Sequence, residues 1–334
     1  MVSKISVIIP CFNARDYINE CLESLLNQSL KEIEIIAIND GSSDDTIKIL
    51  NEFANTDNRF IIIDQKNNGA SAARNAGIEA SSGEFIMFLD SDDFLSSNGI
   101  LNKLYNIALN LDADIVFGDF NYYKNGEIKY QKNYICNEGI VDKERFLFDY
   151  FTLNPSKSTF PTVCAKIIKT EILKNNNLKF LKDVFIAEDA NLNAKIIWLA
   201  NKIAKLNDPI YNYRIGDNNS SKKFKLKHFT DVRAVEMDLR NFFSKFNLLK
   251  TQKAYLECYF LILRYNAALT MKPYSFDDYE KAIKFACADI KNSFKSDGFT
   301  LLNKRLKILF YLYKFSCNYK IYAKLLSFIF KIRH

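Results

Sequence analysis

The first 120 residues alternate between short apolar runs and longer segments in which apolar residues recur every three or four positions. The short runs predict buried strands and the periodic segments predict amphipathic helices. Uniformly apolar strands that alternate with helices are typical of a mostly parallel sheet with helices on both faces, so we expect an α/β fold. The expected order is strand 5–9, helix 18–26, strand 35–38, helix 47–54, strand 60–63, helix from about 71, strand 85–89, helix 100–108 and strand 115–120.

The pattern changes after this region. Asn125-Gly126 predicts a hairpin turn, and residues 132–161 are less periodic, as expected of an irregular insertion. From about Lys222 the pattern is helical only, so we place a domain boundary near 214–222. We therefore expect an α/β domain over residues 1–215 and a helical region over 216–334.

The charge differs between the two regions. Residues 219–334 carry 23 Lys or Arg and 9 Asp or Glu, a net charge of +14, which leaves −7 for residues 1–218. Beyond Asp297 basic residues alternate with apolar ones and no side-chain carboxylate occurs. This composition favours peripheral contact of 298–334 with an anionic membrane; a helix hairpin with solvated lysines is the alternative. The helices could also join two copies of the chain, and no nucleic-acid partner is expected.

The composition also narrows the chemistry. Seven cysteines without CxxC spacing fit a reduced compartment better than a disulfide framework, and we expect a cytoplasmic location because no segment has the length and apolarity of a membrane span. With only His228 and His334 available, imidazole catalysis and histidine metal sites are nearly excluded. A metal ion would have to be held by oxygen atoms.

Acidic and polar residues follow three of the predicted strands, where an open parallel sheet places its ligand. The sharpest cluster is Asp90-Ser91-Asp92-Asp93, whose carboxylates repel one another unless a cation offsets them. Mg²⁺ and Mn²⁺ take few protein carboxylates and complete their shell with water and phosphate oxygens, so the cluster predicts a diphosphate substrate. The alternative is that Asp93 caps the next helix.

Asp40 ends the second strand, before a turn that Gly41, Ser42, Ser43 and Asp44 would form in any case. At the strand terminus its carboxylate can accept a hydrogen bond from a base or a ribose. Neither G-x-G-x-x-G nor G-x-x-x-x-G-K-[ST] occurs, so the nucleotide is not held as in Rossmann or P-loop proteins.

Four motifs in this order resemble the inverting family 2 glycosyltransferases of the GT-A fold, strongly over residues 5–120 and moderately to about 215. The resemblance implies transfer from a nucleoside-diphosphate sugar, usually UDP-linked, with Mn²⁺ or Mg²⁺. It implies that 1–120 binds donor and metal and that 121–215 holds the acceptor side. The motifs are Val7-Ile8-Ile9-Pro10-Cys11-Phe12-Asn13, Asn39-Asp40-Gly41-Ser42-Ser43-Asp44-Asp45-Thr46, Asn67-Asn68-Gly69-Ala70-Ser71-Ala72-Ala73-Arg74-Asn75 and Leu89-Asp90-Ser91-Asp92-Asp93.

The resemblance also implies roles for single residues. Asp92 would hold the metal, and Phe12 would lie against the base; alternatively, Phe12 is a core aromatic residue. Arg74 would face the base or the diphosphate, unless it lies on a solvated helix face. The residues implied to bind the nucleotide sugar are Pro10, Phe12, Asn13, Asp40, Arg74, Asp90, Ser91 and Lys166.

Downstream, Glu188-Asp189 resembles the carboxylate pair from which the family draws its catalytic base, and we expect Asp189 to be that base. The pair could instead only favour the first turn of a helix through its dipole. Less specific matches place Lys166 and Arg214 near the phosphates. We therefore expect an enzyme that builds a cell-surface glycan on a glycan or lipid-linked acceptor; the alternative is a non-catalytic nucleotide-sugar-binding or scaffold protein.

Overall fold

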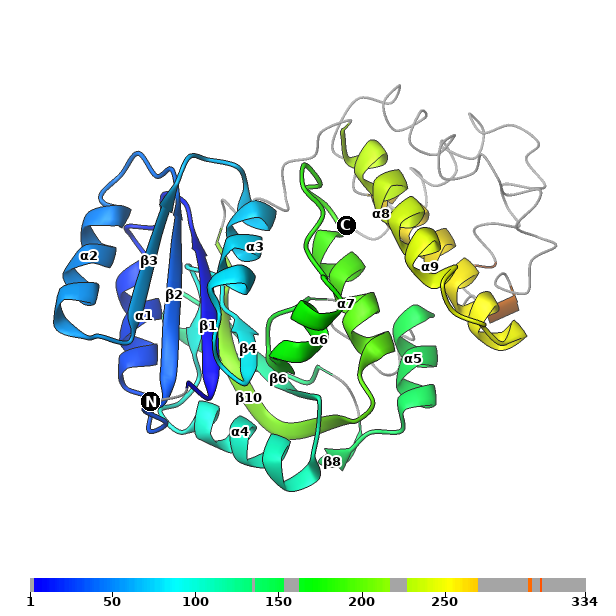
Figure 1. Ribbon diagram of the computed structural model, residues 1–334, viewed down its shortest axis with the longest axis horizontal. Coiled ribbons are helices and arrows are strands. Elements are labelled where there is room, and N and C mark those ends of the chain that lie inside the picture. The colour runs from blue at the N-terminus through cyan, green and yellow to red at the C-terminus, as the bar shows by residue number, and fades with distance from the viewer. Residues whose placement is uncertain are drawn as a thin grey trace. The chain divides into compact units, whose positions relative to one another are not determined.

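The computed structural model describes residues 3–133, 136–152, 162–216, 227–269, 300, 301 and 307 (Figure 1). The chain divides into two compact units. Unit 1 comprises Met1–Leu147, Ser156–Asp183 and Glu188–Asn219, and unit 2 comprises Phe148–Pro155, Val184–Ala187 and Ser220–His334. The expected membrane contact and self-association of the basic tail fall on residues outside this description, apart from three positions, and so does most of the expected boundary.

Unit 1 is built on a sheet whose first four strands are parallel and lie in the order β3-β2-β1-β4. The direction in which successive strands are added therefore reverses at β1. The boundary between the neighbouring strands β1 and β4 is thus the topological switch point of the sheet. These strands are almost wholly apolar, as predicted. Their bounds are β1 Ile5–Cys11, β2 Ile33–Asp40, β3 Phe60–Gln65 and β4 Phe85–Phe88.

The sheet continues through β9, β6, β10 and β5, and β7 and β8 pair with β6 and β10. Only β9 and β5 run against the other strands of the path among the described residues, which confirms a mostly parallel sheet. The predicted turn at Asn125-Gly126 joins β6 to β7, and both residues have the positive φ that this turn needs. The bounds are β5 Phe94–Leu95, β6 Ile115–Lys124, β7 Glu127–Gln131, β8 Gly139–Ile140, β9 Lys166–Lys169 and β10 Ile203–Arg214.

Helices cover both faces of the parallel strands, with α1 and α2 on one side and α3 on the other (Figure 1). This follows from right-handed crossovers, because the connection from β3 to β4 runs back across the sheet. Close packing fixes α3: a Cβ on Gly77 would lie 2.3 Å from Ile8 Cγ2. The helices of unit 1 are α1 Ile18–Leu26, α2 Thr46–Thr56, α3 Ala70–Ala80, α4 Ile100–Leu111, α6 Thr170–Asn175 and α7 Glu188–Leu199.

Residues 132–161 are not wholly irregular, contrary to the sequence prediction. They contain β8 and helix α5, Lys143–Phe151. Four buried residues of this segment, Phe146, Leu147, Tyr150 and Phe151, have helical spacing. The apolar face of α5 is short and mostly aromatic, so the sequence shows little helical periodicity there.

Unit 2 contains two described helices, α8 Lys227–Phe243 and α9 Lys250–Leu269, as the helical pattern predicted. Arg240 on α8 joins them, because it pairs with Glu236 on its own helix and with Glu257 on α9 at 2.7 Å. Aromatic rings also pack together in this unit, where the Phe151 and Tyr259 ring centroids lie 5.3 Å apart. No helix in the described part of the chain is long and apolar enough to cross a membrane.

A buried carboxylate anchors the end of the sheet opposite the predicted site. Glu34, near the start of β2, accepts hydrogen bonds from the Ser6 hydroxyl, from the Ser82 backbone and hydroxyl, and from Gly83 N at 3.1 Å. Burial alone would raise the pKa of Glu34, but the hydrogen bonds outweigh it and lower the pKa below its ordinary value of 4.5. Glu34 therefore ties β1 and β2 to the turn that leads into β4.

We expect Glu34→Gln to lower the free energy of unfolding by about 1–3 kcal/mol at neutral pH. The glutamine amide has one acceptor oxygen instead of two, so some of the hydrogen-bond donors of Ser6, Ser82 and Gly83 would lose their acceptor. Since the folded state lowers the pKa of Glu34, its contribution is present above the ordinary pKa and is lost as the pH falls through the folded value. The difference between wild type and variant should shrink in acid. Urea denaturation measures it, with Glu32→Gln as the control, because the Lys4–Glu32 pair is a third exposed. Equal losses in both variants would contradict this role of Glu34.

Candidate active site

The carboxyl ends of β1, β2 and β4 meet at one rim of the sheet. Cys11 pairs in register with Asn39, Ile8 pairs with Phe88, and Asp40 pairs with Gln65. The polar residues that follow these strands therefore come from distant parts of the sequence to one edge, as predicted. This edge includes the switch point, where open α/β sheets bind their ligands.

The loops after β1 and β2 are joined by hydrogen bonds. Asn13, whose φ is +49°, accepts a bond from Ser43 N at 2.8 Å, and its own backbone N–H donates to the Ser42 hydroxyl at 3.0 Å. The neighbouring Phe12 is 52% exposed. The alternative that Phe12 is a core residue is therefore wrong, and its ring is open to a flat ligand; Pro10 beside it is half-buried.

Asp40 is buried and fixes the loop before α3. Its Oδ1 accepts hydrogen bonds from Gln65 Nε2 at 2.7 Å and from Asn68 N at 2.9 Å, and its Oδ2 accepts one from Gly69 N at 2.8 Å. A carboxylate has about four acceptor positions, so one further bond is possible. Contact between Asp40 and a base stays a prediction.

The acidic cluster forms a turn rather than a helix start. The Asp93 backbone N–H donates to Asp90 O at 3.0 Å, β5 begins at Phe94, and α4 begins only at Ile100. Asp93 is therefore not the cap of the next helix, and that alternative is wrong. Its side chain is 1% exposed and accepts a bond from Arg214 N at 2.8 Å.

The crowding of carboxylates has an electrostatic cost. Burial, and then repulsion by Asp90, raise the pKa of Asp92 above its ordinary value. The pKa of Asp93 is raised further, by burial and then by repulsion from Asp90 and Asp92. No Lys or Arg among the described residues forms an ion pair with the Asp92 side chain. Asp92 and Ser91 are half-buried at the rim. Asp92 is thus the carboxylate of the cluster that is both accessible from the rim and without an ion pair among the described residues.

Arg74 lies buried at the centre of three other carboxylates. Its Nη2 donates to Asp90 Oδ1 at 2.8 Å, and its Nη1 lies 3.6 Å from Asp189 Oδ1 and 3.9 Å from Glu188 Oε1. Burial alone would lower the pKa of the guanidinium, but Asp90 and Asp189 raise it above its ordinary value. Arg74 is only 6% exposed, so the alternative of a solvated helix face is wrong. Its predicted contact with base or diphosphate stays a prediction.

The two carboxylates at the start of α7 differ in their surroundings. Asp189 Oδ2 accepts a hydrogen bond from the Thr162 hydroxyl at 2.9 Å, and its Oδ1 faces Arg74. Burial, and then the charge of Asp189, raise the pKa of Glu188 to about 7. Both residues lie in the first turn, where the helix dipole favours them, but both also face the guanidinium. The chain therefore brings Asp189 to the same site as Asp90.

Lys166, the first residue of β9, contacts the loop at Thr162 and helix α7. Its Nζ donates to Thr162 O at 2.7 Å and to Asn193 Oδ1 at 2.9 Å, and burial lowers its pKa to about 8. The side chain is 5% exposed, so its described contacts are with the protein. Its predicted contact with the nucleotide sugar stays a prediction.

Sequence reasoning missed several residues that support the site. Thr162 bonds to Asp189, and the sulfur of Cys164 lies 3.9 Å from Asp90 Oδ2. Asn75 holds the backbone of Phe180 with two bonds of 2.8 and 2.9 Å, and that ring lies 5.3 Å from the Arg74 guanidinium. Asn75 lies within a motif that resembles the family and could have been assigned. Thr162 carries no local signal.

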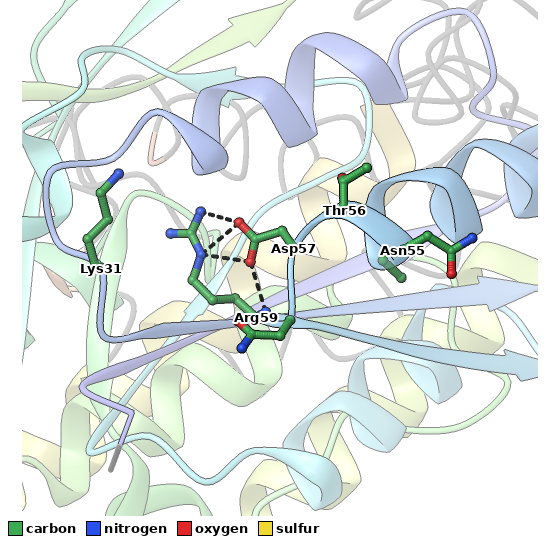
Figure 2. A pocket seen from close by; sticks show the side chains of 7 residues that line it. Lys31, Asn55, Thr56, Asp57 and Arg59 are labelled. Atoms are coloured by element: carbon green, nitrogen blue, oxygen red, sulfur yellow. Dashed lines mark hydrogen bonds and ion pairs between the residues drawn. The ribbon is translucent and has the colours of Figure 1, made fainter.

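A polar hollow of about 670 Å³ lies at the other end of the sheet, before the starts of β2 and β3. It is lined by Lys31 and residues 54–59. Arg59, one of the lining residues, already has a partner for its guanidinium: Figure 2 shows it beside Asp57, and Arg59 Nη2 lies 2.7 Å from Asp57 Oδ2. Arg59 also donates to the carbonyl of Leu26 at the end of α1, so we read this feature as a helix-end contact.

The rim, with an exposed aromatic ring and carboxylates at the switch point, places the chain among α/β proteins that bind ligands beyond the carboxyl ends of their strands. Residues 6–175 match the family model described as glycosyl transferase family 2. The chain belongs to this family, as its motifs indicated.

Two curated relatives and one solved structure illustrate the similarity. Glycosyltransferase GlyA of Streptococcus pneumoniae serotype 4 is 33% identical over 217 residues, which cover 64% of this chain and 30% of GlyA. Poly(ribitol-phosphate) beta-glucosyltransferase of Bacillus spizizenii is 32% identical over 216 residues, covering 64% and 32%. The chain thus spans about a third of these relatives. The crystal structure of S. aureus TarS 1-349 in complex with UDP-GlcNAc has a TM-score of 0.73 at 21% identity, covering 96% and 90%, and shows the same fold.

The ion pairs of Arg74 generate a stability prediction. We expect Arg74→Gln to lower the free energy of unfolding by about 2–4 kcal/mol, because Asp90 and Asp189 would lose their buried counter-ion. The loss should be larger at about pH 8 than at about pH 6, because Glu188, with a pKa already raised, takes up a proton in that interval and relieves the repulsion. Urea denaturation at both pH values measures this.

The matched control is Arg59→Gln, which removes a guanidinium from a local pair with Asp57 at the opposite end of the sheet. The pKa of Asp57 is lowered by its hydrogen bond with Arg59, so that pair does not titrate between these pH values. A loss for Arg74→Gln that is the same at both pH values would contradict the proposed charge balance.

Proposed function

We propose that the chain is an inverting glycosyltransferase that moves a sugar from a UDP-sugar to a hydroxyl group of a glycan or lipid-linked acceptor in cell-surface polysaccharide synthesis. The observation that carries the proposal is the gathering of Asp92, Asp90 and Asp189 at the switch-point rim, with one buried arginine between the last two. Family membership supports the reaction class. The name of the poly(ribitol-phosphate) relative supports a polymeric acceptor.

The donor half of the rim suits a nucleotide. The exposed ring of Phe12 offers a flat apolar surface to a base, and the loops on either side are fixed by Asn13 and Asp40. Preorganised loops reduce the entropy lost on binding. The TarS structure of the same fold holds UDP-GlcNAc, which supports a UDP-linked donor for this chain.

A divalent cation, Mn²⁺ or Mg²⁺, fits the rim through Asp92. No group of three or more His, Cys, Asp or Glu among the described residues is arranged as a complete metal site. A single half-buried carboxylate that is accessible from the rim suits a cation that completes its shell with phosphate oxygens and water. Bound there, the cation would supply positive charge to the diphosphate as it leaves.

Asp189 is the proposed catalytic base. The acceptor oxygen bonds to the anomeric carbon and its proton passes to the Asp189 carboxylate. The bond from that carbon to the diphosphate oxygen breaks, and UDP leaves with the electron pair. Attack opposite the leaving group inverts the anomeric configuration. The hydrogen bond from Thr162 orients Oδ2 of Asp189, and its Oδ1 faces the Arg74 guanidinium at 3.6 Å without a hydrogen bond.

We expect Asp189→Asn to reduce kcat for UDP release from the UDP-sugar that the wild type uses by at least about 10²-fold, because the amide cannot take the acceptor proton. KM for the donor should change little, since Asn can still accept the Thr162 bond. Glu188→Gln is the control, because it removes the neighbouring charge and leaves the base. A panel of UDP-sugars with Mn²⁺ provides the assay. Unchanged kcat in Asp189→Asn would exclude this residue as the base.

We expect Asp92→Asn to abolish most of the stimulation of UDP release by Mn²⁺, a loss of about 10²-fold, because its carboxylate would no longer hold the cation. Asp45→Asn is the matched control, since it removes an exposed carboxylate from the neighbouring rim loop. Release of UDP that responds to Mn²⁺ equally in wild type and Asp92→Asn would contradict the metal role. Absence of UDP release in the wild type with every donor would favour the non-catalytic alternative.

A further inference from the structure

Arg214, the last residue of β10, is joined to the acidic turn after β4 by two hydrogen bonds. Its backbone N–H donates to Asp93 Oδ1 at 2.8 Å, and its side-chain Nε donates to the carbonyl oxygen of Asp92, also at 2.8 Å. Arg214 therefore holds both the peptide group between Asp92 and Asp93 and the side chain of Asp93. The Asp92 carboxylate is left out of both bonds.

The guanidinium of Arg214 is itself enclosed. Its central carbon lies 4.8 Å from the centre of the Tyr123 ring, 5.1 Å from that of Tyr17 and 5.6 Å from that of Phe94. Its Nη2 pairs with Glu20 on α1. The side chain is 17% exposed. Stacking on aromatic faces and a carboxylate partner at the far end leave the guanidinium little freedom.

These contacts connect separate elements of unit 1 to one turn. Tyr17 and Glu20 come from the start of α1, Phe94 from β5 and Tyr123 from β6. The turn is closed from within by the bond from Asp93 N to Asp90 O. With the backbone held from both sides, the direction of the Cα–Cβ bond of Asp92 is fixed.

We propose that Arg214 is a positioning residue for Asp92: it holds the Asp92 carbonyl so that the carboxylate faces the diphosphate of the donor and its cation. The inference rests on the proposed function. Contact of Arg214 with the diphosphate itself, which the resemblance implied, stays a prediction, since Asp92 O and Glu20 engage Nε and Nη2 only. Groups that orient a metal ligand typically change metal affinity by about 10–100-fold when removed.

The test is calorimetric titration of the intact chain with UDP, with and without Mn²⁺. In Arg214→Met the gain in UDP affinity that Mn²⁺ provides should fall by about tenfold or more, while the affinity for UDP without Mn²⁺ stays within about twofold of wild type. A role of Arg214 in the fold alone would lower both affinities together. The two titrations therefore separate positioning from general loss of structure.

Two milder variants keep the test valid if Arg214→Met does not fold. Arg214→Lys keeps a positive charge but has no Nε–H in the fork geometry that reaches the Asp92 carbonyl, so it should lose most of the Mn²⁺ gain. Glu20→Gln, at a side chain 46% exposed, leaves the bond to Asp92 in place and should lose less. The expected order of the Mn²⁺ gain is wild type, Glu20→Gln, Arg214→Lys, with Arg214→Met lowest.

The matched control is Arg240→Met in unit 2. Arg240 also pairs with carboxylates, Glu236 and Glu257, and lies 4.4 Å from the centre of the Phe260 ring, and all three of these partners belong to unit 2. It should leave the Mn²⁺ gain unchanged. An unchanged gain in Arg214→Lys, or an equal loss in Arg240→Met, would overturn the inference while the proposed function stands. A wild type that binds no UDP with Mn²⁺ would overturn both.

Discussion

The structure depends on how it balances negative charge at the carboxyl ends of its parallel strands. Asp90, Glu188 and Asp189 converge on the buried guanidinium of Arg74, whose nitrogens lie between 2.8 and 3.9 Å from their oxygens. Without that cation the carboxylates would repel one another in a partly desolvated site. Because Arg74 is on α3 and α3 packs tightly on β1 and β2 through Gly77, the charge balance is tied to the core of the sheet.

The buried cations of the rim serve different carboxylates. Arg74 pairs with Asp90 and the proposed base, Arg214 holds the turn that carries Asp92, and Lys166 supports the loop at Thr162 that bonds to Asp189. None of them forms an ion pair with Asp92 in the described structure. The protein thus neutralises or fixes other acidic groups of the rim, and the proposed function assigns the remaining Asp92 carboxylate to a cation that arrives with the substrate.

Local patterns predicted the elements around the rim but not the contacts across it. The apolar strands, the helix of Arg74 and the turn at Asn125-Gly126 follow from periodicity and turn chemistry, which act over a few residues. Helix α5 was overlooked because its apolar face is short. The ion pair of Arg74 with Asp189 and the hydrogen bond of Arg214 to the Asp92 carbonyl join residues more than a hundred positions apart. Nothing in local sequence specifies such a pair; it arises only when the sheet order brings the strand ends together.

The central claim is that this rim binds a nucleoside diphosphate through a cation on Asp92, with the base against Phe12. A crystal structure of the intact chain with UDP and Mn²⁺ tests it most directly. The account predicts Mn²⁺ between the Asp92 carboxylate and the diphosphate, with the uracil ring at Phe12. UDP bound elsewhere on the protein, or Mn²⁺ at the rim without contact to Asp92, would contradict it.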